Sequence, residues 1–245
     1  MNMAGSLIFL RKVQFEKGTV NYESNRIILA NLVLEELKMR KLIILLVTLG
    51  VLLLTGCSFR ENAKLIELDK KYNQGQYEIV VEEANKFVSD NPDSYRGWNI
   101  LGWAYLKLDN YKKAEECFDR SIAINPNYDN AYVGKGVLCR EDGDFAAARE
   151  WYLKAIAITP QNPEAFSSLL VIELKEGNDA KAVEYGEKAW TLRKDSPVIA
   201  ANLAIAYHYI GDVKKRDEFY EHAKRLGYLN LQTLKEIFEG KLSLR

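Results

Sequence analysis

Histidine is scarce in this sequence, and so are the arrangements that usually build catalytic and metal sites. The 245 residues include two histidines, His208 and His222, which excludes most zinc sites and most Ser/His or Cys/His nucleophile pairs. They fall on different predicted helices without a set of further ligands at tight spacing, so we expect solvated or groove-lining side chains. A phosphate-binding glycine loop, a nucleophile elbow and a catalytic carboxylate pair are also missing. The sequence therefore predicts no enzyme activity, no metal site and no bound cofactor.

Cysteine is rare as well. Three cysteines, Cys57, Cys117 and Cys139, are too few for a disulfide scaffold, and their odd number leaves at least one that needs its own explanation. Cys117 and Cys139 both fall on predicted helices, where we expect them to pack as small apolar residues. A disulfide is the alternative, which export from the cytoplasm would permit.

A net charge is also lacking. Lys plus Arg and Asp plus Glu each number 34, so no basic field favours nucleic acid and no acidic excess favours cationic partners. We therefore expect no nucleic-acid partner. With 48% hydrophobic and 28% charged residues, the composition is that of an ordinary folded chain. Two features stand out against this background, an apolar segment and a repeated pattern.

The apolar segment runs from Leu42 to Gly56 without a charged residue. Arg40 and Lys41 precede it, and Cys57 follows immediately after it. Basic residues, a short apolar stretch and small residues, in this order, are typical of a signal peptide. A membrane-spanning helix needs about 20 apolar residues, which this stretch does not reach, so a permanent span is the weaker interpretation.

The residues Leu54-Thr55-Gly56-Cys57 resemble the lipobox of bacterial lipoproteins, in which the signal peptidase cuts just before the cysteine. The resemblance implies that residues 39–56 are a removed signal peptide and that Cys57 carries a covalent diacylglyceryl lipid. Residues 57–60 would then be a short lipidated tether to the membrane. Two acyl chains anchor a protein stably, because each buried CH₂ contributes about 0.8 kcal/mol.

The same resemblance implies a location. The protein would be lipid-anchored on the extracytoplasmic side of a bacterial membrane, close to the bilayer because the tether is short. Ser58, where an Asp would signal retention, resembles outer-membrane sorting. In a cell with two membranes, the implied location is therefore the periplasmic face of the outer membrane.

Residues 1–38 do not fit in front of such a signal, because its basic region normally begins near the translation start. We expect Met39 to be the true first residue and residues 1–38 to be an extension that is not translated. Two alternatives stay open for the longer chain. The segment from Leu42 either remains as an uncleaved anchor, with the rest exported because positive charge precedes it, or inserts in the opposite orientation.

Several residue types recur every 34 residues over most of the remaining chain. Prolines show this period at Pro92, Pro126 and Pro160. Turn residues, which end one helix and lead into the next, recur at Gly75, Asp109, Gly143, Gly177 and Gly211. Small residues recur in the same register at Ala114, Ala148 and Ala182. A fixed period of this length indicates a solenoid of repeated units.

The unit at residues 95–128 carries the fullest pattern. Its marker residues are Trp98, Leu101, Gly102, Tyr105, Ala114, Phe118 and Pro126. They resemble the tetratricopeptide repeat at each of its main spacings. The resemblance implies an all-α fold, an α-solenoid of about five 34-residue helix-turn-helix units. Residues 61–230 contain these units, at 61–94, 95–128, 129–162, 163–196 and 197–230.

Each unit needs small residues where its two helices cross. We expect Gly102 to face Ala114 at the crossing, while larger side chains such as Phe118 fill the wider gaps. The last unit has Arg216 where a small residue is usual, because one face of a terminal unit meets water. Residues 231–245 should form a capping helix and tail, since one face of the helix is apolar.

In tetratricopeptide-repeat proteins the first helix of each unit lines a concave groove, and the resemblance implies that this groove binds a protein or peptide. The ninth helix positions are Asp69, Trp103, Val137, Val171 and Ile205. They are flanked by Arg96, Asn99, Arg140, Ser167, His208 and Tyr209. We predict the strongest contacts at Trp103 and Arg140, residue types that dominate binding surfaces. The alternative is that Trp103 and the valines merely pack against neighbouring helices.

The two resemblances together imply a non-enzymatic scaffold or adaptor in a bacterial envelope, anchored to the membrane by lipid. Its layout is similar to that of type IV pilus assembly lipoproteins and of adaptors that dock cell-wall hydrolases. The lysine and asparagine clamp with which some members hold a ligand's carboxylate is absent. The alternatives are an accessory subunit that positions a separate catalytic partner, and an uncleaved membrane-anchored scaffold.

Replacing Cys57 tests the lipid assignment. We expect the protein to incorporate a palmitate analogue in a bacterial host, and the Cys57→Ser variant to stay unlabelled because the acceptor thiol is gone. Labelling is measured on the purified protein. Equal labelling of the two proteins contradicts the assignment.

Overall fold

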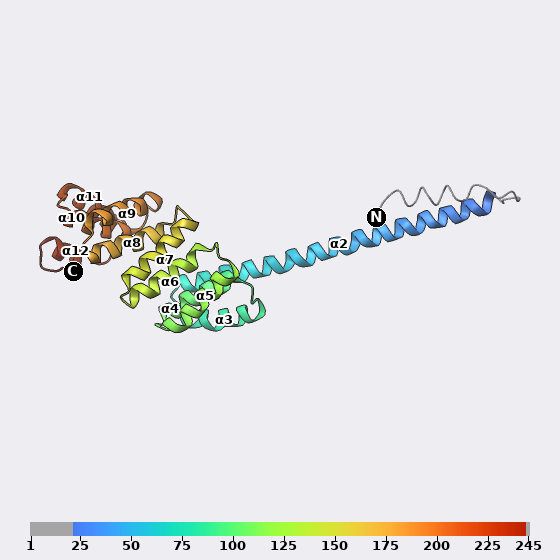
Figure 1. Ribbon diagram of the computed structural model, residues 1–245, viewed down its shortest axis with the longest axis horizontal. Coiled ribbons are helices and arrows are strands. Elements are labelled where there is room, and N and C mark those ends of the chain that lie inside the picture. Colours follow the sequence, from blue (N-terminus) through green and yellow to red (C-terminus); the bar gives the residue numbers. More distant parts are fainter. Residues whose placement is uncertain (1–21, 244–245) are drawn as a thin grey trace. The chain divides into compact units, whose positions relative to one another are not determined.

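The computed structural model describes the backbone of residues 22–243 and the side chains of residues 31–47 and 60–243. These residues form α-helices and turns, and no strand occurs among them (Figure 1). The chain divides into one part that ends at Asn62 and a second part from Ala63 onward. Helix α2 (Tyr22–Asn73) begins in the first part, and its last turns belong to the second.

In the first part, every described side chain of α2 between residues 31 and 47 is exposed. The apolar residues 42–47 are between 49% and 62% exposed. Within the described residues, no helix is apolar over a length that would cross a membrane. Residues 1–21 and the side chains of residues 48–59, including that of Cys57, lie outside the described residues. The untranslated extension, the signal peptide and the lipid on Cys57 therefore stay predictions.

In the second part, helices joined by short turns follow one another along the chain (Figure 1). The end of α2 is followed by α3 (Tyr77–Asp90), α4 (Tyr95–Lys107), α5 (Tyr111–Ile124), α6 (Asp129–Glu141), α7 (Phe145–Ile158), α8 (Pro163–Glu176), α9 (Asp179–Leu192), α10 (Pro197–Tyr209), α11 (Val213–Arg225) and α12 (Leu231–Phe238).

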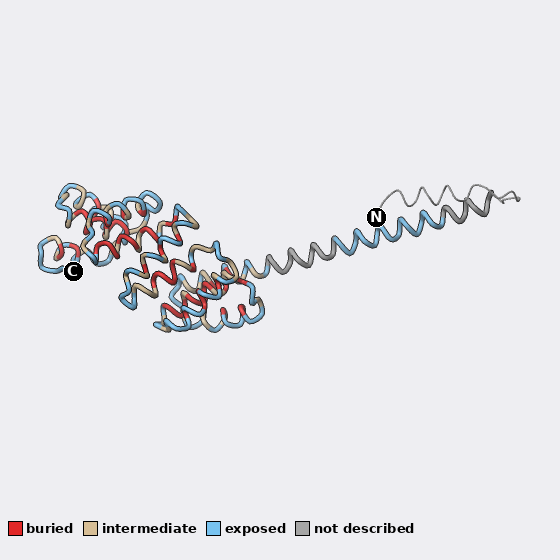
Figure 2. The backbone as a smooth tube through the Cα atoms, in the orientation of Figure 1, coloured by how far each residue is buried: buried red, intermediate tan, exposed pale blue. Residues whose placement is uncertain are grey.

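The packing of these helices repeats from pair to pair. The most extensive contacts join α4 to α5, α6 to α7, α8 to α9 and α10 to α11. The second helix of each pair also packs on the first helix of the next, and the first helices α4, α6, α8 and α10 contact one another in turn. Buried residues lie where the helices meet (Figure 2). This arrangement confirms the predicted all-α solenoid.

The turns within the pairs need a left-handed backbone. Gly75, Gly143, Gly177 and Gly211 have φ between 75° and 83°, a region that costs glycine little because it has no Cβ. Asp109 takes the same place with φ 57° and is the one non-glycine residue of the described chain with positive φ. Aspartate tolerates this region better than most residues, and the Asp109 carboxylate accepts a hydrogen bond from the Tyr111 hydroxyl at 3.0 Å.

The core between α4, α5 and α6 centres on the fully buried ring of Phe118. A Cβ atom on Gly102 would lie 2.8 Å from this ring, and a Cβ on Gly134 would lie 2.5 Å from it. The sequence placed Phe118 in the wider gaps beside the crossing of Gly102 and Ala114, but the atoms nearest to a Cβ on Gly102 belong to Phe118 and Cys117, so the Phe118 ring lies at the crossing itself. The two glycines let the neighbouring first helices α4 and α6 both pack closely against one aromatic side chain.

Helix α12 covers the end of the last pair. Leu234 and Ile237 are buried, and the Phe238 ring packs 6.1 Å from the Tyr220 ring, centroid to centroid. The Arg216 guanidinium lies 5.2 Å from the centroid of Phe238, a favourable cation–π contact. Arg216 can therefore replace the usual small residue because a ring of the cap lies over its charge.

Charged side chains are buried between the pairs. The Lys135 ammonium on α6 contacts Glu115 at 2.9 Å and Asp119 at 2.8 Å, both on α5. Glu173 on α8, with 1% of its surface exposed, accepts a 2.9 Å hydrogen bond from Arg149 Nε on α7. A buried charge without its partner is strongly destabilising. These pairs therefore favour the observed stacking of one pair on the next.

Placing a methyl group at Gly134 should destabilise the solenoid. Alanine is a better helix former than glycine by up to about 1 kcal/mol, but its Cβ would overlap the Phe118 ring, and overpacking costs about 1–3 kcal/mol. We expect Gly134→Ala to lower the free energy of unfolding, measured by urea denaturation followed by circular dichroism.

As a control, the same Gly134→Ala substitution is made in a Phe118→Leu variant, which lacks the ring. In that background Gly134→Ala should cost less than in the unaltered chain, or stabilise it, because neighbouring substitutions that share a contact are not additive. Equal costs in both backgrounds would mean that the ring is not what excludes the methyl group.

Candidate functional site

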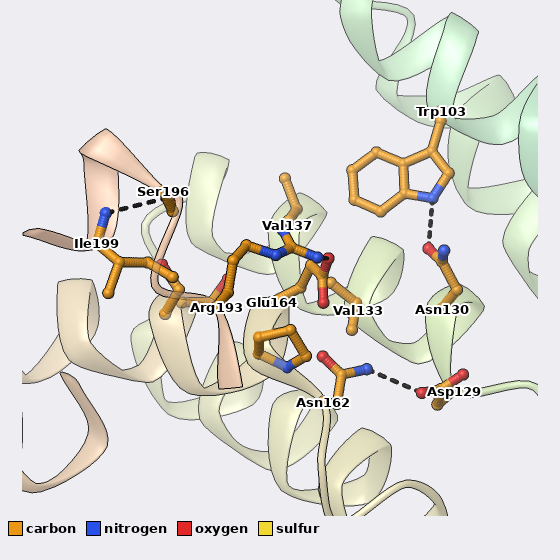
Figure 3. Close-up of a pocket in the computed structure, with 13 residues that line it drawn as sticks. Trp103, Asp129, Asn130, Val133, Val137, Asn162, Glu164, Arg193, Ser196 and Ile199 are labelled. Carbon is orange, nitrogen blue, oxygen red and sulfur yellow. Dashed lines mark hydrogen bonds and ion pairs between the residues drawn. The ribbon is translucent and has the colours of Figure 1, made fainter. Parts of the chain in front are cut away.

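A hollow of about 360 Å³, which we call the first hollow, lies along the layer of first helices (Figure 3). Its lining comes from α4, α6, α8, α10, the segment between α7 and α8 and the segment between α9 and α10. The residues are Trp103, Asp129, Asn130, Val133, Val137, Asn162, Pro163, Glu164, Ser167, Ser168, Arg193, Ser196 and Ile199. Because four first helices contribute, the first hollow depends on the stacking of the pairs.

Trp103 stands at one end of the first hollow (Figure 3). Its indole Nε1 donates a 2.9 Å hydrogen bond to Asn130 Oδ1 on α6. Its ring meets the ring of Phe118 edge to face, with 5.5 Å between centroids. The side chain is half-buried, so part of the indole stays accessible while two contacts hold it. A large aromatic surface held in place in this way loses little entropy when a ligand packs on it.

The polar groups of the first hollow are already ordered by contacts within the chain. Asn162, 6% exposed, donates from Nδ2 to Asp129 at 2.9 Å and accepts at Oδ1 from the backbone N–H of Ala165 at 2.7 Å. Asn162 thereby caps the start of α8. Arg193 forms an ion pair with Glu164. The hollow therefore has a mixed polar and apolar lining of fixed geometry.

A second hollow of about 410 Å³ adjoins the first and shares Trp103, Asn130 and Glu164 with it. The remaining lining residues come from α2, α4 and the turn before α6 and are Asp69, Tyr72, Asn73, Arg96, Asn99, Ile100 and Tyr128. We call this the second hollow. Trp103 thus belongs to both and separates one stretch of the concave surface from the other.

Two polar side chains of the second hollow are buried or half-buried without partners that fully replace their contacts with water. Asn99 is 3% exposed, and its Oδ1 atom is buried without a hydrogen-bond partner. Burial raises the pKa of the Asp69 carboxyl, and the positive charge of Arg96 offsets only part of this effect. Burial also raises the pKa values of Tyr72 and Tyr128 to about 12. The second hollow therefore has hydrogen-bond acceptors that the chain itself does not fully satisfy.

The structure brings together six of the eleven groove residues that the sequence predicts. The second hollow is lined by Asp69, Arg96, Asn99 and Trp103, and the first by Trp103, Val137 and Ser167. Val137 is nevertheless 8% exposed, so packing accounts for most of its surface. For these residues contact with a ligand stays a prediction.

The other five predicted residues line neither hollow, and they are Arg140, Val171, Ile205, His208 and Tyr209. Ile205 is 4% exposed. The His208 ring lies 5.2 Å from the Phe238 ring of the cap, and burial and the charge of Arg216 lower its pKa. Arg140 pairs with the neighbouring Glu141 at 2.8 Å. A ligand role for these five also stays a prediction.

Sequence reasoning missed several lining residues. Asn130 and Glu164 occupy the same position of their units as Arg96, so extending that position to every unit would have found them. Asn162 and Arg193 lie before the first helices, in the segments between pairs. No helical periodicity reaches these segments, because their side chains are placed by capping and ion pairing.

Side chains that could bind a metal ion or act as a nucleophile do not gather at the two hollows. Among the described residues no group of histidine, cysteine and acidic side chains has the arrangement of a metal site. Cys117 and Cys139 are free thiols, and Cys117 is buried, which raises its pKa to about 12. Cys117 therefore packs as a small apolar residue and is a poor nucleophile at neutral pH.

The comparisons with known proteins agree with the fold. A family model described as tetratricopeptide repeat matches residues 69–129 and 101–163. Solved structures similar to the chain include Pseudomonas aeruginosa pilF, with 19% identity over 74% of this chain and 85% of that one and a TM-score of 0.62. TTC0263, a thermophilic tetratricopeptide-repeat protein of Thermus thermophilus, has 20% identity over 74% and 97% of the two chains and a TM-score of 0.61.

A third similar structure is YrrB, described as a tetratricopeptide-repeat protein with an unusual peptide-binding site. It has 14% identity over 71% of this chain and 89% of that one, with a TM-score of 0.50. The search of the curated proteins returned no match. At these identities the similar structures establish the fold alone. Together with the matched family model, they show that the chain contains tetratricopeptide repeats folded into an α-solenoid.

Proposed function

We propose that the chain is a non-enzymatic scaffold that binds a protein or peptide in the first and second hollows, and that a lipid on Cys57 anchors it in a bacterial envelope. The observation that carries the proposal is Trp103, a half-buried aromatic side chain that belongs to both hollows. A ligand that lies along the first helices would contact this indole wherever it crosses from one hollow to the other.

The shape and chemistry of the surface favour an extended or helical peptide over a small molecule. The two hollows are open and adjoin along several helices, whereas small-molecule sites are usually enclosed and mostly apolar. The apolar surface of Trp103 lies among the exposed polar side chains of Asn130, Glu164 and Arg193. Such a surface suits side-chain anchors flanked by hydrogen bonds to a peptide. The similar protein YrrB is described as having a peptide-binding site, which supports this use of the fold.

The sequence supports the membrane part of the proposal. Basic residues, a short apolar segment and the motif Leu54-Thr55-Gly56-Cys57 are the features that a lipoprotein signal peptide requires. We propose the extracytoplasmic side of the membrane, and the periplasmic face of the outer membrane in a cell with two membranes. A partner that is itself an enzyme would make the chain an accessory subunit through the same surface.

Removing the Trp103 side chain should abolish capture of the partner. We expect the full chain, purified in detergent from the bacterium that encodes it after mild crosslinking, to carry a specific envelope protein. Trp103→Ala should lose that protein, because the aromatic surface between the hollows is gone and such anchors commonly contribute more than about 2 kcal/mol to binding. Capture is measured by quantitative mass spectrometry.

The matched control is Trp151→Ala on α7. Trp151 is equally large and partly exposed but lines neither hollow, so this variant should keep the partner. Circular dichroism establishes that both variants fold. Unchanged capture by Trp103→Ala, or equal loss in both variants, contradicts binding at the hollows.

A further inference from the structure

The second hollow contains an acceptor that the folded chain leaves unpaired. Asn99 on α4 is 3% exposed, and its Oδ1 atom has no hydrogen-bond partner. Buried side-chain oxygens in native proteins are rarely without a donor, because an unpaired acceptor loses its hydration and gains nothing in return. Asn99 lines the second hollow, so the unpaired acceptor belongs to a side chain that borders the space a ligand would occupy.

Carboxylates line the same hollow. Asp69 on α2 is half-buried, and its pKa is raised because burial outweighs the attraction of Arg96. Arg96 therefore does not replace all of the stabilisation that water would give the ionised carboxylate. Glu164, which also lines the hollow, adds negative charge, although its ion pair with Arg193 balances it. A further cation would stabilise the Asp69 carboxylate.

Aromatic side chains complete the surroundings. Tyr72, Trp103 and Tyr128 line the hollow beside the acceptors. The faces of such rings attract cations, and arginine in particular stacks on them. An anion entering the same space would be attracted by Arg96, but it would be repelled by the carboxylates of Asp69 and Glu164 and by the unpaired Asn99 oxygen. The lining therefore favours a positively charged group with several N–H donors.

We propose that the second hollow receives an arginine or lysine side chain of the bound peptide, whose N–H groups donate to Asn99 Oδ1 and to the Asp69 carboxylate. The proposal rests on the proposed function, since it names one feature of the ligand that the hollows bind. Arginine fits better than lysine, because its guanidinium carries five donors in one plane and can serve both acceptors while it stacks on a tyrosine. The first hollow then receives the neighbouring, more apolar residues of the same peptide.

The test uses random short peptides displayed on phage, selected against the full chain in detergent micelles. Micelles without protein remove peptides that bind detergent. Selected sequences should carry arginine or lysine at one fixed distance from an apolar residue. A selected peptide is then synthesised with arginine and with citrulline, which has the same shape without the charge, and the Kd of each is measured by fluorescence anisotropy.

Substituting citrulline for arginine should weaken binding to the unaltered chain about tenfold, as expected for loss of charge-assisted hydrogen bonds. On Asp69→Asn the difference should fall below about twofold, because the neutral amide no longer distinguishes the two peptides. Asp90→Asn makes the same charge change at an exposed residue that lines neither hollow. This control should keep the tenfold difference.

The possible results distinguish failure of the basic-residue proposal from failure of the proposed function. Peptides that bind and are weakened by Trp103→Ala, but show no preference for arginine over citrulline, contradict the basic-residue proposal and leave the proposed function standing. The same holds if the selected peptides are enriched in acidic residues. It also holds if a backbone N–H of the peptide satisfies Asn99, so that Asp69→Asn leaves the difference in Kd between the arginine and citrulline peptides unchanged. Failure to select any peptide above the micelle background contradicts both proposals.

Discussion

The packing of Gly102 and Gly134 against the ring of Phe118 is the contact on which the surface with the two hollows depends. A Cβ on either glycine would lie within 2.8 Å of the ring, so no larger residue fits without a shift in the backbone or the ring. This contact holds α4 and α6 side by side. The indole of Trp103 rests on the same ring and reaches across to Asn130 on α6. The proposed site for a ligand is therefore a direct extension of the core.

Close packing of a glycine against a large side chain recurs along the solenoid with different residues. A Cβ on Gly136 would lie 2.5 Å from Tyr152, and one on Gly186 would lie 2.6 Å from Leu203. Each contact sets how closely successive helices approach, and the hollows lie along helices that are spaced in this way. Stacked repeats of this kind gain their stability from such neighbour contacts. Binding geometry and stability are thus coupled, because the side chains that fill the crossings also support the groove.

The period of 34 residues predicted the solenoid and the resemblance to the tetratricopeptide repeat predicted its helices, since a turn residue marks every unit and a small residue marks the three central ones. It was not enough to predict which side chain meets Gly102. Ala114 and Phe118 are one helical turn apart and share a face of α5, so periodicity cannot distinguish them, and the packing places Phe118 there. Helix positions likewise predicted Arg96, Asn99 and Trp103 at the hollows. Asn162 and Arg193 were missed because the capping of α8 places the first side chain and an ion pair with Glu164 places the second.

The central claim is that a protein or peptide lies in the hollows around Trp103. The most direct measurement is photocrosslinking in the bacterium that encodes the chain, with benzoylphenylalanine at Ser167, which lines the first hollow, or at Glu150, an exposed residue on α7 outside both hollows. Our account predicts a discrete adduct from Ser167 and none from Glu150. Adducts from Glu150 alone, or the same adducts from both positions, would contradict it.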